Sequence, residues 1–215
     1  RDAKFEVTLK ANSATATYDG EAHSAAGVEK DTFEIGGVTY KVSGYQTSDP
    51  SSTNATAGMP NKVTGTYVVT DADNNVVTDQ FNVKTEDGSL VINKAPLTLA
   101  SATLTKAYDG KALANANAGD EGVTASAQLN ANGLATESGW VKDEGATYSF
   151  DNSQTLVGEK ANAFTVTAKE GTDLGNYEIS KTEGKLVVAN RDAKFEVTLK
   201  ANSATATYDG EAHSA

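Results

Sequence analysis

The chain has 215 residues, with 18 Lys and Arg against 29 Asp and Glu, and its formal net charge is −11. This acidic balance argues against nucleic acid and anionic membrane surfaces as partners, since both would repel it. The chain contains no Cys, which excludes a disulfide framework, a thiol nucleophile and a Cys-based metal site. We find no signal peptide, no apolar run near 18 residues and no wall-sorting tail, so we expect an internal fragment without direct membrane insertion.

Repetition is the strongest feature of the sequence. Residues 191–215, RDAKFEVTLKANSATATYDGEAHSA, are identical to residues 1–25. Looser similarity would satisfy a packed core, so identity over the whole segment indicates a duplicated gene segment. We therefore expect one period of a tandem array, followed by the opening of the next, in a module that builds length.

A fainter repeat divides this period into two halves. Three blocks align: residues 99–110 over 9–20, 148–155 over 40–47, and 176–179 with 186–188 over 80–83 with 90–92. The offsets between the halves are 90, 108 and 96 residues, which predicts matching strands and differing loops. Two related units, residues 1–94 and 95–190, would join near Lys94-Ala95-Pro96, and each has an ordinary domain size.

Along the chain, the residue pattern predicts short strands separated by turns. Phe5, Val7 and Leu9 alternate with polar residues, and Phe164 and Val166 do the same in the second half, as is typical of half-buried strands. Turns are expected at five pairs: Asp19-Gly20, Gly36-Gly37, Asp87-Gly88, Asp109-Gly110 and Glu183-Gly184. Helical signals are confined to a turn or two near residues 119–135. The expected fold class is all-β.

Several motifs resemble a known group of repeats. These are Tyr18-Asp19-Gly20 after an alternating strand, the Gln-Thr block, Asn176-Tyr-Glu-Ile with Gly184-Lys-Leu-Val-Val, and the Asn93-Lys-Ala-Pro joint. Together they resemble the YDG and MBG type repeats of large bacterial cell-surface proteins, over nearly the whole chain. The resemblance implies an extracellular β-rich repeat, Ig-like or β-grasp-like, of the kind found in adhesins and wall-attached stalks, with no catalytic residues.

The repeated segment 191–215 is predicted to complete a fold. Ordering a residue costs about 1–2 kcal/mol of backbone entropy, so an ordered segment must pair with a neighbour. We expect Phe195, Val197 and Leu199 to pack on the second unit. Each unit would then borrow strands from the next, and the array would be an elongated, stiff rod.

One loop has the residue types of a calcium site. Asp71, Asp73, Asn75 and Asp79 place oxygen atoms near one another in sequence, and Ca²⁺ prefers oxygen ligands. The spacing lacks the Gly and the distal Glu of an EF-hand. A hairpin turn, in which Asp and Asn bond their own backbone, is the stronger prediction.

Trp, His, paired acidic residues and Asn provide the remaining candidates for binding or chemistry. Trp140 is the only Trp, and an exposed Trp would suit a sugar, although a core or inter-unit position is favoured. His23 and His213 are one repeat position, so no triad or zinc site is expected, and a surface position beside a turn is favoured. Likewise, the acidic pairs Asp120-Glu121 and Asp143-Glu144 are expected in solvated turns. Asn93 or Asn190, with a Lys near the first strand, provides the residue types of an isopeptide link but no pairing.

Two functions follow from the sequence. The first is a structural stalk that holds a distal binding region away from a bacterial cell, with adjacent identical repeats as its partners. The second is a set of weak, multivalent adhesion modules for host glycans or surface proteins, in which many copies supply avidity. An enzyme is not expected, and neither is a cofactor.

Overall fold

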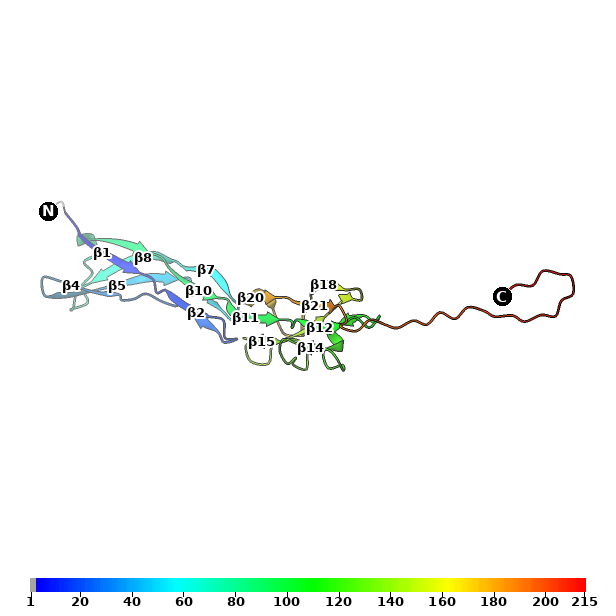
Figure 1. Cartoon of the computed structure of the whole chain (residues 1–215). Coiled ribbons are helices and arrows are strands. Elements are labelled where there is room, and N and C mark those ends of the chain that lie inside the picture. Colours follow the sequence, from blue (N-terminus) through cyan, green and yellow to red (C-terminus); the bar gives the residue numbers. More distant parts are fainter. Residues whose placement is uncertain (1–2) are drawn as a thin grey trace.

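The computed structural model describes residues 3–215, and its fold is all-β, as predicted. Strands and three short 3-10 turns are the only regular elements of this part of the chain. None of the helical segments within residues 3–215 is long and apolar enough to cross a membrane. Figure 1 shows two groups of strands that follow one another, and then an extended C-terminal segment.

The first group of strands is formed by residues 5–93. Its elements are β1 (Phe5–Lys10), β2 (Ala14–Thr17), β3 (His23–Ser24), β4 (Thr32–Ile35), β5 (Val38–Thr47), β6 (Ser51–Ser52), β7 (Thr56–Asn61), β8 (Val63–Thr70), η1 (Thr78–Gln80), β9 (Phe81–Glu86) and β10 (Gly88–Asn93). The first two strands pair in parallel with the last two, β1 with β9 and β2 with β10. β10 also pairs with β7, β3 pairs with β6, and β5 lies between β4 and β8.

The second group repeats this plan. Its elements are β11 (Ala95–Ala100), β12 (Leu104–Ala107), β13 (Leu113–Ala114), η2 (Asn115–Asn117), β14 (Thr124–Ala125), β15 (Thr136–Ser138), β16 (Ala146–Ser149), β17 (Ser153–Gln154), β18 (Gly158–Asn162), β19 (Thr165–Ala168), η3 (Leu174–Asn176), β20 (Tyr177–Thr182) and β21 (Gly184–Ala189). β11 is parallel to β20 and β12 to β21. β14 and β15 are edge strands beside β12 and β11. Both lie between β13 and β16, where the second half has a longer connection than the first.

Two of the three aligned blocks occupy equivalent strands. Tyr18 donates its backbone N–H to the carbonyl of Asn93, and Tyr108 does the same to Ala189, so the Tyr-Asp-Gly blocks are equivalent. The final blocks are equivalent as well. β9 and β20 each pair in parallel with the first strand of their unit, β1 or β11, and β10 and β21 each pair with the second, β2 or β12.

The middle blocks are not equivalent in the register that the sequence predicts. Tyr148 pairs with Val166 in β19, at the place where Tyr45, rather than Tyr40, pairs with Gly65 in β8. Gln154 lies in β17 and pairs with Leu113, whereas Gln46 lies inside β5. The short Tyr and Gln-Thr matches carry no information on register: the observed equivalence of Tyr148 with Tyr45 lies five residues from the expected one.

The buried side chains follow the predicted alternation. Val7 and Leu9 are buried in β1, with Phe5 half-buried. Phe164 is buried directly before β19, in which Val166 is half-buried. Leu97 and Leu99 are likewise buried in β11, the equivalent of β1. One apolar cluster lies in the outer part of the first unit around Val42 and Phe81, and another lies in the outer part of the second unit around Leu104 and Leu186. A third, between them, contains residues of both units.

A buried Asn occupies the same place in both units. Asn61 is opposite Gly88, and Asn162 is opposite Gly184. The Asn61 side chain donates to the carbonyls of Asn12 and Gly27, and Asn162 donates to the carbonyl of Ala102. Each Asn thus satisfies backbone groups where the first strand passes into the second, which is necessary because a buried carbonyl without a donor is costly.

The predicted turns at Gly88 and Gly184 are wrong. β9 runs on into β10, and β20 into β21, with one intervening residue and the same direction of pairing. A Cβ on Gly88 would lie 2.1 Å from the Asn12 carbonyl oxygen, and one on Gly184 would lie 2.3 Å from the carbonyl carbon of Ala102. Glycine is therefore used for close backbone approach.

The expectation for residues 191–215 is also wrong. Residues 193–215 form no strand, and Phe195, Val197 and Leu199 are 59%, 78% and 91% exposed. In the first copy, the same strands pair with β9 and β10 of their own unit. The sequence holds no second copy of residues 81–93, and the matching partners in the second unit already pair with β11 and β12. Within residues 3–190, each unit therefore pairs its first two strands with its own last two, and no strand is borrowed from the next unit.

The glycine contacts predict a selective loss of stability. We expect Gly88→Ala and Gly184→Ala each to lower the free energy of unfolding by about 1–3 kcal/mol or more, since the new methyl group meets fixed backbone. Gly119→Ala is the matched control, because its Cβ would meet no atom within 4 Å. Urea unfolding measures all three, and equal effects would contradict the close-approach argument.

Candidate functional site: the joint between the two units

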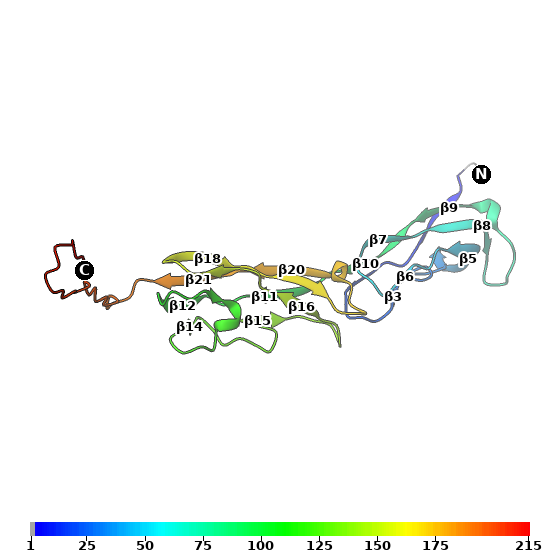
Figure 2. The same cartoon turned by 90° about the vertical axis from the view of Figure 1, so that its right-hand side faces the viewer.

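The two units are joined by a single residue. β10 ends at Asn93 and β11 begins at Ala95, so only Lys94 lies between two paired strands. The central apolar cluster crosses this point: Tyr18, Leu90 and Ile92 of the first unit share it with Leu97 and Tyr177 of the second. Figure 2 shows β10, β3 and β6 meeting the second unit at this point. Packing on both sides of so short a link restricts bending.

Glu144 is the central polar group of the joint. Its Oε1 accepts a hydrogen bond of 2.5 Å from the Tyr18 hydroxyl, and its Oε2 accepts one from the Tyr177 hydroxyl. The two rings pack edge to face with centroids 5.7 Å apart. Tyr177 is held in turn by Val141, whose backbone N–H donates to its hydroxyl over 3.0 Å. One carboxylate thus connects a tyrosine from each unit.

Further polar contacts surround this carboxylate. Lys142 Nζ donates to the Gly20 carbonyl over 2.8 Å and forms an ion pair of 2.7 Å with Glu21. Asn176 accepts from the backbone N–H of Ala55 over 2.9 Å and donates to Asn54 Oδ1 over 3.1 Å. Exposed ion pairs contribute little stability singly. These contacts surround the buried pair of tyrosine rings. Together they fix the orientation of the first unit relative to the second.

The environment shifts the pKa of both tyrosines. The hydrogen bond to Glu144 raises the pKa of Tyr18, and burial adds to this effect. The pKa of Tyr177 is raised well above its ordinary range. Burial is the largest cause, and the hydrogen bond to Glu144 is the next. Both shifts arise because a tyrosinate would be buried beside a negative charge.

Trp140 lies in the second unit next to the joint. Its ring packs edge to face on Tyr177 with centroids 5.0 Å apart, and its indole N–H donates to Glu137 Oε1 over 3.0 Å. Glu137 also accepts hydrogen bonds from Tyr148, Asn130 and Asn132. Burial raises the Glu137 pKa, but these donors outweigh burial and hold it below its ordinary value. The half-buried Trp140 therefore has protein partners for both its ring and its N–H.

The loop considered for calcium forms an Asx turn. Asp71 Oδ1 accepts from the backbone N–H groups of Asp73 and Asn75, and Asp71 Oδ2 accepts from the Asn75 side chain. These bonds lower the pKa of Asp71. Asp79 lies farther on, in η1. Residues 3–215 hold no group of three or more His, Cys, Asp or Glu side chains that could bind a metal ion.

The remaining candidates are not brought together. His23 contacts Asp19 over 2.9 Å beside the Asp19-Gly20 turn, and His213 repeats this contact with Asp209 in the extended segment. Asn93 is in register with Thr17, whereas Lys10 is in register with Glu86 and pairs with Glu29. The structure thus gives no Lys–Asn pair from these residues.

Sequence reasoning missed the role of Glu144. Its place in the acidic pair Asp143-Glu144 predicted a solvated turn, because nothing in the local sequence shows which side chains of another unit approach it. Tyr18 carried the only signal, since an aromatic residue that directly follows a strand and precedes a turn is well placed to cover the end of the unit.

Comparisons with known proteins gave no match. No family model matches the chain, and neither the curated proteins nor the solved structures gave a significant match. The likeness to YDG and MBG repeats therefore depends on the motifs of this sequence alone.

The repeated sequence provides a matched pair of variants for the joint. We expect Tyr18→Phe to lower the free energy of unfolding by about 1–2 kcal/mol, because Glu144 loses a donor in a partly buried site. Tyr208→Phe changes the same residue in the same sequence context, but Tyr208 is 94% exposed, and we expect no change. Urea unfolding measures both, and equal losses would show that the joint contact contributes nothing.

The raised tyrosine pKa values predict a loss of stability in alkali. Unfolded tyrosines ionise near pH 10, whereas Tyr18 and Tyr177 ionise only above that value in the folded chain. Their stabilising contribution is complete below about pH 10 and is lost as the pH rises through the folded-state values. We expect the urea midpoint to fall above about pH 10, and to fall less in Glu144→Gln. An identical pH profile for this variant would contradict the assignment.

Proposed function

We propose that this chain is a structural spacer repeat of a bacterial cell-surface adhesin, which places a distal binding region away from the cell. The observation that carries this proposal is the joint, in which one linking residue, a shared apolar cluster and the Tyr18–Glu144–Tyr177 contact hold two units end to end. Stacking similar units in this way increases length with little bending.

The path of the chain supports the same role. In each unit the first strands are parallel to the last, so the chain enters at one end and leaves at the other. Each added repeat then extends the molecule, as the succession of units in Figure 1 illustrates. Residues 191–215 repeat the sequence that forms β1 and β2 in the first unit, so a complete next repeat would open with the same two strands.

The composition and the candidate sites are consistent with a non-catalytic, extracellular spacer. The chain is acidic and free of Cys, and in the proposed setting its partners are adjacent copies of the same repeat. The strongest ligand candidates from the sequence, Trp140 and the Asp71 loop, use their polar groups within the protein. Spacing, rather than recognition, is therefore the role that these residues support.

A binding assay and a scattering measurement test this proposal together. We expect the intact chain to show no saturable binding to mucin or glycan arrays, because the proposed role requires none. We also expect small-angle X-ray scattering to report a larger spread of shapes for Glu144→Ala than for the unmodified chain, since the joint loses its central acceptor. Saturable glycan binding by the unmodified chain would instead support the multivalent adhesion role and overturn the spacer.

A further inference from the structure

The exposed apolar side chains gather at the two outer ends of the folded part. Among the residues that the structure describes before the extended segment, the exposed large hydrophobic residues are Val38, Val76, Leu156, Val157 and Ile179. All but Ile179 lie at an outer end. Isolated exposed apolar residues are ordinary on a protein surface, but two pairs confined to opposite ends are not.

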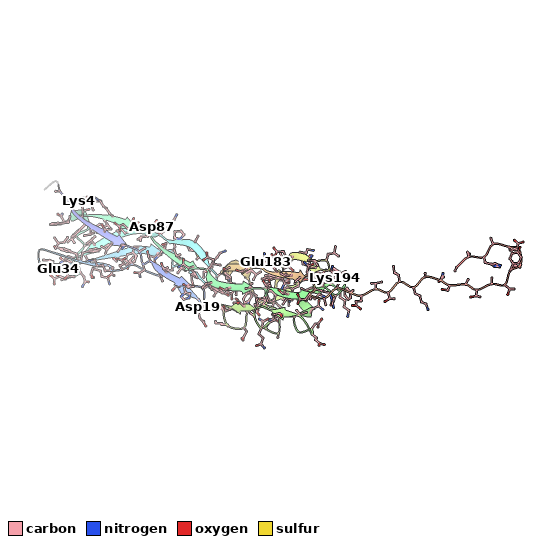
Figure 3. The ribbon with its side chains drawn as sticks, viewed as in Figure 1. Lys4, Asp19, Glu34, Asp87, Glu183 and Lys194 are labelled. Atoms are coloured by element: carbon pink, nitrogen blue, oxygen red, sulfur yellow. The ribbon has the colours of Figure 1, made fainter. Side chains whose placement is uncertain are left out.

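Register places the first pair, Val38 and Val76, at the free end of the first unit. Val38 is at the start of β5, opposite Ile35 in the hairpin with β4. Val76 bridges Thr70 at the end of β8, just before η1. Val38 is 41% exposed and Val76 is 70% exposed. Figure 3 shows this end through Glu34 of β4 and Lys4, both at the far left of the view.

Leu156 and Val157 lie at the opposite end, where the chain leaves the second unit. They directly precede Gly158, which is opposite Val188, near the last residue of β21. Leu156 is 70% exposed and Val157 is 48% exposed. In the first unit the corresponding loop, between β6 and β7, holds Asn54 and Ala55, and that loop contacts Asn176 of the next unit. Leu156 and Val157 thus occupy the place that forms the observed joint.

The second joint cannot copy the first. The Tyr177 hydroxyl donates to Glu144 at the first joint, but its equivalent, Phe81, has no hydroxyl to donate. Phe81 packs instead on Phe5 and Tyr40 of its own unit, at 5.7 Å and 4.8 Å between centroids. The link is also longer: β21 ends at Ala189, and the copy of the first strand residue is Phe195. These five intervening residues can span about 17 Å.

We propose that Leu156 and Val157 form an apolar joint with the next copy of the first unit, against Val76 and the neighbouring η1 turn. The inference rests on the proposed tandem array, in which residues 191–215 open that copy. The array then alternates two joints: a tyrosine–carboxylate joint with a one-residue link, and an aliphatic joint with a five-residue link. The occupant is a second copy of this chain's own first unit.

A tandem chain with two complete repeats tests the aliphatic joint. The chain has no Cys, so Val157→Cys in the first repeat and Val76→Cys in the second provide a single thiol pair. We expect disulfide formation within one molecule to be at least about tenfold faster than for a control pair that joins Ile179→Cys to the same Val76→Cys, because docking raises the local thiol concentration. Circular dichroism verifies that each variant is folded.

The two proposals fail in different ways. Equal oxidation rates for the two thiol pairs in folded chains would overturn the aliphatic joint, while the spacer function would stand with a flexible second link. Saturable glycan binding by the unmodified chain would overturn the spacer function whatever the thiols do. As a second readout, Leu156→Asp with Val157→Asp should reduce the maximum dimension of the two-repeat chain in scattering, and an unchanged value would also overturn the aliphatic joint.

Discussion

The parallel pairing of the first two strands of each unit with its last two is the constraint on which the structure depends. β1 and β2 have no other long partners, and β9 and β10 follow them only after about 70 residues of chain. A unit is therefore complete only when its own last strands are present. This explains why one sequence forms strands at residues 5–17 and an extended segment at 195–207.

The parallel pairing of the first and last strands also determines how consecutive units can be joined. The chain emerges at the end opposite to its entry, so consecutive units meet end to end. Domains joined in one chain move relative to one another by default, unless the interface between them is hydrophobic and well packed. The first joint meets this requirement with a carboxylate between two tyrosines and an apolar cluster that crosses the boundary. Without these contacts, Lys94 would be a simple link between two independent domains.

The sequence predicted the fold where the signal was local or was repeated over long blocks. Alternation identified β1, and the Tyr18 and Tyr108 blocks were equivalent as expected. Prediction from the sequence failed where a residue's position depends on partners that are distant in the sequence. Asp87-Gly88 has the residue types of a turn, and the close approach of the Asn12 backbone to Gly88 leaves no local mark in the sequence. The partners of Glu144, Tyr18 and Tyr177, likewise lie far from it in sequence. Residues 195–207 form no strand because the last strands of the second unit already pair with β11 and β12.

Hydrogen exchange at the two copies of one sequence tests this account most directly. Residues 5–17 and 195–207 are identical, so their intrinsic exchange rates match, and NMR separates their resonances by environment. The account predicts strong protection of the amides that β1 and β2 donate to β9 and β10, and no protection of the same amides in the second copy. Equal protection of both copies in a monomeric chain would contradict it.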